Sequence, residues 1–565
     1  MFIKSWRIKS NGQAAQAECP GVSRVILQLL HNRGVFDFDD IKKFLRPNYE
    51  DLHDPFLFKD MEKAMDRIKK AKESGEKIFV YGDYDADGVC SSVLISEALK
   101  NIGIQDLGIY IPHREKEGYG INKHAIDFIL TKKASLIISV DCGISSNEEI
   151  SYAKSKGIDV IVIDHHEEPL EKPKDACAVL NPHSRGETYP FLELSATGVV
   201  FKTVQAIWKF FGLKEGMEKW FLDLVAIATV SDMMRLVGEN RIFVSYGLVV
   251  LNKTKRPGLK TIIKTIKTTS SRIGTYEIGF MIGPRLNSAG RMDHANSAFE
   301  LLAAQDPIHA QSLALGLERK NSSRQSETER IFKQAQALAD EQIKDNKVLV
   351  IVGDNWQPGV VGLVAGRITE KYHRPSLVIT RLGNKLVGSG RSIEGFNITE
   401  AIEKCSDLLL RFGGHEGACG FTVKSENDLT IFEKRMNEIA SLVLSENDLV
   451  KILDIDMKIE LSQTNISLVE EIESMGPFGI GNPTPKFASF GVRVESANFV
   501  GGDKHLKIRL SQGNFYAEAI SFGFKDSFRF ILSEGDLIDI AYELSANIWN
   551  GHKSVQLKII DIKKQ

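Results

Sequence analysis

The stretch IFVYGDYDADG, residues 78–88, joins a short apolar run to three aspartates. Similar apolar runs follow at 108–111, 136–140 and 160–163, and the segments between them, such as 147–156, have helical spacing. Short apolar runs that alternate with helices are typical of βαβ units, which assemble into a parallel sheet. The sequence therefore predicts an α/β fold built on a parallel sheet.

Acidic and histidine side chains follow the ends of these runs. The carboxyl ends of the strands in an open parallel sheet form the edge at which ligands bind, so we expect these side chains to lie close together. One more aspartate follows the helical stretch 222–230. The candidates are Asp83, Asp85 and Asp87 after the first run, Asp141 after the third, Asp164, His165 and His166 after the fourth, and Asp232.

Carboxylates gathered at the end of a buried strand repel and desolvate one another unless a cation lies between them. Oxygen ligands with one or two imidazoles and no thiolate suit Mn²⁺ or Mg²⁺ better than structural zinc. Two such ions can activate water and stabilise both oxygens of a phosphoryl displacement. A lone DxD motif is more often a helix N-cap, and a lone histidine pair usually lies at the surface or in the core. Their repetition at successive strand ends predicts a metal site.

The rest of the chain changes character twice. Residues 305–346 are polar and Ala-rich, which favours a long connecting helix. From about 450 the sequence alternates as short strands do, which fits a small closed barrel, and an OB-fold is the simplest choice. We therefore predict an N-terminal segment at 1–50, a parallel-sheet domain at 51–304, a connector helix at 305–346, a smaller α/β domain at 347–448 and an OB-fold at 449–565.

Composition excludes several classes of protein. The 72 Lys and Arg residues nearly balance 74 Asp and Glu residues, so any surface that binds nucleic acid must be local. The six cysteines form no CxxC pair, which argues against a disulfide framework and a structural zinc site. The start lacks the apolar core of a signal peptide, and no stretch is long enough to span a membrane. We expect a cytoplasmic protein and, by default, a monomer.

The motifs YGDYDADG, SVDCG and IDHH, followed by Asp232, resemble in order those of the DHH phosphoesterase superfamily. The resemblance implies that Asp85, Asp87, Asp141, His165 and Asp232 bind metal. It implies that Asp83 and His166 support the reaction or contact phosphate.

Further motifs resemble the RecJ family of exonucleases within that superfamily. These are PHREKEGYGIN at 112–122, FMIGPRLNSAGRM at 280–292, GSGRS at 388–392, GGHEGACG at 413–420 and GPFGIGNP at 476–483. Two of them are marks of a substrate-binding DHHA1 domain, and the last opens the OB region. Cys419 stands where the family more often has alanine.

This resemblance implies a 5′-to-3′ exonuclease that degrades single-stranded DNA with two Mn²⁺ or Mg²⁺ ions, releases mononucleotides, and acts in recombination and repair. A single-strand-binding protein and a repair helicase are the partners to expect.

The resemblance also implies substrate contacts. Arginine forks suit phosphate oxygens, and we place Arg285 in a polar loop and Ser389 and Arg391 on a Gly-rich turn. His415 is predicted to contact the scissile phosphate. The predicted substrate-binding residues are Arg114, Arg285, Asn287, Arg291, Ser389 and Arg391, with Phe515, Tyr516, Phe522 and Trp549 as candidates to stack on bases or, equally, to fill the barrel core.

Two alternatives stay open. A phosphodiesterase for small substrates, such as dinucleotides, would share the metal motifs, although such enzymes usually lack a C-terminal OB-like domain. A non-catalytic DNA-binding scaffold would be expected to have lost motif acids, whereas every expected acid is present here.

Overall fold

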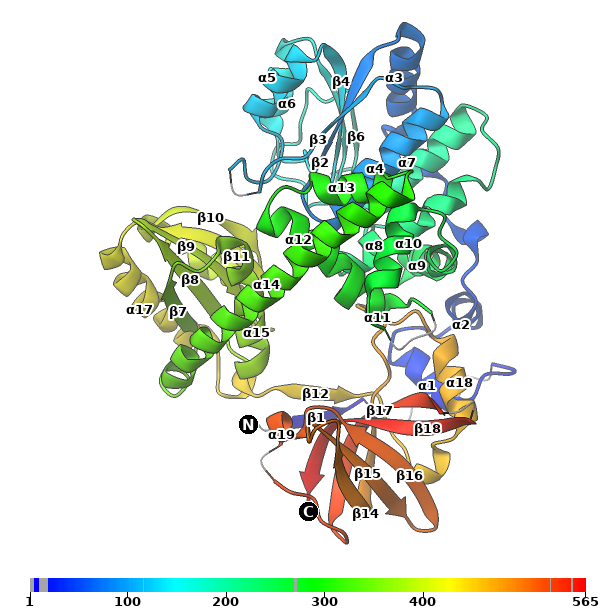
Figure 1. Cartoon of the computed structure of the whole chain (residues 1–565), viewed down its shortest axis with the longest axis vertical. Coiled ribbons are helices and arrows are strands. Elements are labelled where there is room, and N and C mark those ends of the chain that lie inside the picture. The colour runs from blue at the N-terminus through cyan, green and yellow to red at the C-terminus, as the bar shows by residue number, and fades with distance from the viewer. Residues whose placement is uncertain (1–4, 10–18, 115, 269–271, 529, 550–551) are drawn as a thin grey trace. The chain divides into compact units, whose positions relative to one another are not determined.

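The structure is a computed structural model that describes residues 5–9, 19–114, 116–268, 272–528, 530–549 and 552–565 (Figure 1). The chain divides into two compact units. The parallel-sheet unit comprises residues 46–324 and 476–483. The second unit comprises residues 1–45, 325–475 and 484–565.

The parallel-sheet unit is built on five strands in the order β3-β2-β4-β5-β6, all parallel. The sequence predicted four of them and missed β6, which has only three residues. The strands are β2 (Lys77–Gly82), β3 (Leu107–Tyr110), β4 (Ala134–Val140), β5 (Asp159–Ile163) and β6 (Ala178–Leu180).

Helices cover both faces of this sheet. Because alternate residues of a strand point to opposite faces, each strand contributes side chains to two cores. Val80 and Ile138 pack into the core shared with α3 (Met61–Ser74) and α4 (Ala86–Asn101). Their neighbours Phe79 and Ile137 pack on the other side, against α5 (Lys123–Thr131) and α6 (Asn147–Ser155). Figure 1 shows these two helix layers on either side of the strands.

Further helices extend the core on the α4 side of the sheet. Residues 280–292 are helical, so the loop predicted around Arg285 is wrong: a π-helical turn, η5 (Ile278–Ile282), leads directly into α12. The α-helices are α7 (Ala196–Phe210), α8 (Leu222–Ser231), α9 (Gly238–Leu251), α10 (Pro257–Thr265), α11 (Thr275–Glu277), α12 (Gly283–Met292) and α13 (Asn296–Ala303).

One helix, α14 (Pro307–Gln342), occupies the predicted connector, and its residues from Gln325 onward belong to the second unit. That unit contains a five-stranded sheet in the order β10-β11-β9-β8-β7. Its elements are β7 (Leu349–Asp354), β8 (Ser376–Leu382), β9 (Lys385–Arg391), β10 (Leu409–His415), β11 (Ala418–Val423), α15 (Pro358–Tyr372), α16 (Ile398–Glu403) and α17 (Glu426–Val443).

Two Gly-rich motifs form strands in this sheet. Ser389 and Arg391 lie on β9, which pairs with both β8 and β11, so the predicted Gly-rich turn is wrong. The motif at 413–420 forms the end of the β10–β11 hairpin. Side chains on β9 alternate between the two faces of the sheet, and Gly388 and Gly390 fill positions where a Cβ atom would meet Phe421, Cys419 or Leu377 within 2.6 Å.

The C-terminal strands close into the predicted barrel. They run in the order β13-β14-β15-β16-β18-β17, and β14 also pairs with β17. The apolar run at 452–455 forms β12, which pairs with β1 (Ser5–Ile8) outside the barrel. The strands are β12 (Ile452–Ile455), β13 (Met457–Lys458), β14 (Phe487–Val500), β15 (His505–Gln512), β16 (Phe515–Ser521), β17 (Leu537–Trp549) and β18 (His552–Lys564).

All six cysteines are free thiols. Of the helices in the described parts of the chain, none combines the length and the apolar character needed to cross a membrane.

Candidate metal centre

The predicted acids and histidines converge at the carboxyl edge of the parallel sheet. Asp83, Asp141 and His165 follow strands β2, β4 and β5, while Asp85 is the N-cap of α4 and Asp232 follows the last residue of α8. Seven of these side chains form three overlapping groups, each with ligand atoms within 4.8 Å of one another. The groups are Asp83–Asp85–Asp141, Asp141–His165–His166 and Asp87–His165–Asp232.

Backbone geometry places the acids of α4 and β4. The Asp85 carboxylate accepts hydrogen bonds from the backbone N–H groups of Asp87 and Gly88, at 2.9 and 3.1 Å, and so caps the helix. A Cβ atom at Gly88 would lie 2.5 Å from the carbonyl oxygen of Asp83, so only glycine permits this tight turn. Asp141 has a left-handed φ of 61°, a conformation that aspartate tolerates better than most residues.

Asp87 and His165 are oriented by the chain that leads into α7. Both carboxylate oxygens of Asp87 accept backbone hydrogen bonds, from Ala196 and Thr197, at 2.8 Å. His165 Nδ1 lies 3.2 Å from the carbonyl oxygen of Leu194, which suits donation from Nδ1. That tautomer leaves Nε2 as the free nitrogen, 3.5 Å from Asp141 and 3.7 Å from Asp232.

Asp164 supports the histidines and is fully buried. It accepts hydrogen bonds from the backbone of Ile144 and His165 and from His166 Nδ1. Burial raises the pKa of Asp164, but the hydrogen bond and charge of His166 outweigh this effect and lower the pKa to about 2. Burial lowers the pKa of His166, but the same hydrogen bond and the charge of Asp164 raise it to about 9. The Tyr119 hydroxyl donates to the backbone carbonyl oxygen of Asp141, and its oxygen lies 3.1 Å from His166 Nδ1.

The carboxylates repel one another in the absence of a cation. Burial, followed by the charge of neighbouring acids, raises the pKa of Asp83, Asp141 and Asp232 well above the usual range. Asp83 Oδ1 is buried and has no hydrogen-bond partner. An orphaned carboxylate oxygen among repelling acids, beside an oriented imidazole, fits a divalent cation and fits no ordinary structural role.

The motif at 280–292 packs against the turn that carries these acids. Asn287 Oδ1 accepts a hydrogen bond from the backbone N–H of Ala86 at 2.7 Å. A Cβ atom at Gly290 would lie 2.5 Å from the carbonyl oxygen of Tyr84. Asn287, which was predicted to contact substrate, holds the start of α4 in this structure.

The predicted arginines of the parallel-sheet unit differ in their surroundings. The Arg114 guanidinium lies over the Tyr84 ring, 4.8 Å from its centre, and its charge acts on Asp83. Arg291 acts electrostatically on the same tyrosine. Arg285 forms a two-pronged ion pair with Glu318 and donates to the Met281 carbonyl oxygen, so a phosphate contact by Arg285 would require this pair to open.

The remaining predicted residues lie in the second unit. Ser389 Oγ donates to the carbonyl oxygen of Cys419 at 3.1 Å, and Arg391 Nη1 donates to Gly390 and Ser389. His415 is exposed at the end of β10, where its Nδ1 accepts from Gly417 at 3.2 Å. In the barrel, Phe515, Tyr516 and Phe522 are 54, 59 and 54% exposed, so they do not fill the core. The side chain of Trp549 lies outside the described residues.

The sequence did not single out Tyr119, Leu194 or Thr197, which orient the predicted ligands. Leu194 acts through its backbone, and only its position before the α7 N-cap, Ser195, could have pointed to it. Tyr119 stands within a quoted motif, but hydroxyl contacts across the sheet edge have no local signal.

Family models match three parts of the chain. They are the N-terminal domain of the DHH family at residues 77–229, the DHHA1 domain at 345–442 and the RecJ OB domain at 455–561.

Known proteins are similar to this chain over most of its length. The single-stranded-DNA-specific exonuclease RecJ of Bacillus subtilis is 36% identical over 96% of this chain and 68% of its own length. The RecJ of Dickeya dadantii is 31% identical over 96% of this chain and 97% of its own. A crystal structure of Thermus thermophilus RecJ with Mn²⁺ superposes with a TM-score of 0.84, at 28% identity, over 99% of this chain and 79% of that one. The chain therefore belongs to the RecJ family.

Proposed function

We propose that this chain is a metal-dependent exonuclease that degrades single-stranded DNA from the 5′ end and releases mononucleotides, in recombination and repair. The observation that carries the proposal is the convergence of Asp83, Asp85, Asp87, Asp141, His165, His166 and Asp232 into overlapping ligand groups. The names of its relatives, which specify single-stranded DNA, support the substrate. Crystal structures of Thermus thermophilus RecJ with Mn²⁺ and with Mg²⁺ support the metals.

The chain's own residues suit two cation positions. Asp83 and Asp85 belong to one group, Asp87 and Asp232 to another, and Asp141 and His165 each belong to two groups. When bound, two divalent cations would activate a water and stabilise both oxygens of an in-line phosphoryl displacement. We assign Asp85, Asp87, Asp141, His165 and Asp232 as metal ligands.

Other residues would bind and orient the DNA. We propose two phosphate contacts at the metal centre: Arg114, whose charge acts on Asp83, and the half-exposed His166, which belongs to one of the ligand groups. Ser389, Arg391 and His415 are proposed to hold the 5′-terminal nucleotide and the scissile phosphate, with Asn287 and Arg291 as further contacts. The cytoplasmic location, the monomeric state and the docking of repair proteins stay predictions.

The direct test is digestion of a long single strand carrying a label at either end, with Mn²⁺. We expect mononucleotides to appear from the 5′ end first, and we expect Asp232→Asn to abolish turnover while it preserves most DNA binding, because phosphate contacts supply affinity. Release from the 3′ end would overturn the polarity. Hydrolysis of dinucleotides alone would favour a small-substrate phosphodiesterase, and no metal-dependent hydrolysis would favour a scaffold.

A further inference from the structure

Two packed helices carry proposed metal ligands at one end and are joined by an arginine at the other. Helix α4 begins at the metal centre with Asp85 and Asp87, whereas α8 ends there, directly before Asp232. Glu97 lies on α4 ten residues beyond Asp87, and Asp223 lies in the first turn of α8. At about 1.5 Å per residue, both acids are about 15 Å from the ligands.

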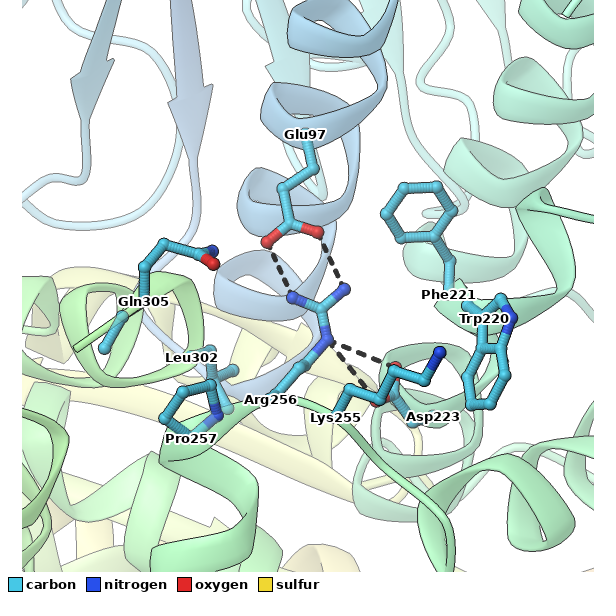
Figure 2. Close-up of a pocket in the computed structure, with 10 residues that line it drawn as sticks. Glu97, Trp220, Phe221, Asp223, Lys255, Arg256, Pro257, Leu302 and Gln305 are labelled. Atoms are coloured by element: carbon cyan, nitrogen blue, oxygen red, sulfur yellow. Dashed lines mark hydrogen bonds and ion pairs between the residues drawn. The ribbon is translucent and has the colours of Figure 1, made fainter. Parts of the chain in front are cut away.

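Arg256 joins these two acids (Figure 2). Its Nη1 and Nη2 atoms donate to the two carboxylate oxygens of Glu97 at 2.6 and 2.8 Å. Its Nε lies 3.3 Å from Asp223 Oδ2, which also accepts a hydrogen bond from Thr254. The side chains of Arg256 and Asp223 are only 13 and 3% exposed, so the fork is shielded from water and fixed in direction.

Removing the guanidinium would leave two acids without their common partner in a poorly solvated place. Such acids move apart or take up protons, because an unpaired buried charge is costly. Helix α4 follows directly on strand β2 of the sheet, whereas Asp223, in the first turn of α8, pairs with Arg256. We therefore expect the loss to displace α8 relative to α4.

We propose that Arg256 is a positioning residue for the metal centre: it sets the spacing of α4 and α8 and hence the distance between Asp87 and Asp232. This inference deepens the proposed function and rests on it. Of the three groups found among the described residues, Asp87–His165–Asp232 alone contains residues of both helix ends, and the other two contain no residue next to α8. A displaced α8 would weaken one cation position and spare the other.

The surroundings of Arg256 make a specific rescue feasible. Its side chain lines an open cavity of about 220 Å³ together with Trp220, Lys255 and Gln305 (Figure 2). In Arg256→Ala the place of the guanidinium would be continuous with this cavity. A methylguanidinium ion could then enter and bridge Glu97 and Asp223 again.

Arg67 provides a matched control. It also forks between two acids, Glu76 at 2.6 Å and Asp159 at 2.7 Å, and its side chain is 10% exposed. Asp159 opens strand β5, at the end of the strand opposite to His165. Arg67→Ala therefore removes a comparable ion pair from the same unit without touching α4 or α8.

The test is calorimetric titration of the full-length variants with Mn²⁺, with thermal unfolding measured in parallel. We expect Arg256→Ala to lower the Mn²⁺ affinity of one of the two positions at least tenfold. Millimolar methylguanidinium should restore that affinity. Arg67→Ala should have a lower melting temperature but bind both ions with wild-type affinity. Glu97→Gln is a milder change and should lower the Mn²⁺ affinity of the same position. It replaces Arg256→Ala as the test variant if Arg256→Ala does not fold.

Three results would overturn the inference. The first is an unchanged Mn²⁺ affinity in Arg256→Ala or, where only the milder variant folds, in Glu97→Gln. The second is an equal loss of Mn²⁺ affinity in Arg67→Ala. The third is no effect of methylguanidinium on the Mn²⁺ affinity of a folded Arg256→Ala. A wild type that binds no Mn²⁺ would instead contradict the proposed function.

Discussion

At the scale of single residues, Asp141 combines a left-handed backbone with a buried carboxyl group. Burial and neighbouring acids raise its pKa, so at neutral pH, where an unfolded aspartate is ionised, this carboxyl group lowers the stability of the metal-free fold. Asparagine removes the charge and tolerates the backbone, whereas alanine adds about 1–2 kcal/mol of strain. In EDTA we expect Asp141→Asn to unfold at or above the wild-type temperature and Asp141→Ala below Asp141→Asn. Neither variant should hydrolyse DNA. An Asp141→Asn variant less stable than Asp141→Ala would contradict this account.

The raised pKa values of Asp83, Asp141 and Asp232 also predict that cation binding releases protons. In the metal-free fold these acids keep protons at pH values where an ordinary aspartate has lost them. A cation must displace these protons, so affinity for Mn²⁺ should fall as the pH is lowered. Titration calorimetry near pH 6 in two buffers with different ionisation enthalpies measures the release directly. Identical heats in both buffers would show that no proton leaves.

At the scale of elements, helix α12 packs against and supports the turn that carries Asp83, Asp85 and Asp87. Gly290→Ala would place a Cβ atom 2.5 Å from the Tyr84 carbonyl oxygen, so it should push this turn away and weaken Mn²⁺ binding and turnover together. Gly316 on α14 has no atom within 4 Å of the equivalent position. Gly316→Ala should leave activity intact and raise helix stability by up to about 1 kcal/mol. Equal effects of the two substitutions on Mn²⁺ affinity would contradict the claim that α12 supports this turn.

Elements also show what sequence patterns can reveal. The convergence of the candidate acids and histidines could be predicted because strand ends are marked by local apolar runs, and parallel strands bring their carboxyl ends together. The strand that holds Ser389 and Arg391 was mistaken for a turn, since its glycines are required by side chains from other strands, such as Phe421. The loop predicted around Arg285 is α12, because its Gly, Pro and Asn residues weaken a helical pattern that packing nevertheless stabilises.

At the scale of the whole molecule, one short segment belongs to a different unit from the residues on either side of it in the chain. The motif at 476–483 was predicted to open the barrel, yet it packs with the parallel-sheet unit. The backbone N–H of Leu236 donates to Ile480, Thr275 Oγ1 donates to Phe478, and Arg241 Nη2 donates to Gly476. These long-range contacts have no local signal in the sequence. They hold residues 476–483 within the parallel-sheet unit.

The barrel contributes no proposed ligand, so we expect it to supply affinity rather than chemistry. Phe515 and Tyr516 are exposed, and Arg509 lies over the Tyr516 ring at 5.1 Å, an arrangement that suits stacking on unpaired bases. Phe515→Ala and Tyr516→Ala should each weaken binding of long single-stranded DNA by about 1–3 kcal/mol. Hydrolysis of a 5′-phosphorylated trinucleotide should be unchanged, because we expect so short a strand to need only the residues that act on its 5′ end. Phe36→Ala, which removes an aromatic ring 61% exposed elsewhere in the same unit, serves as the control. A loss of equal size on the trinucleotide, or with Phe36→Ala, would show that the rings act on the fold and not on the DNA.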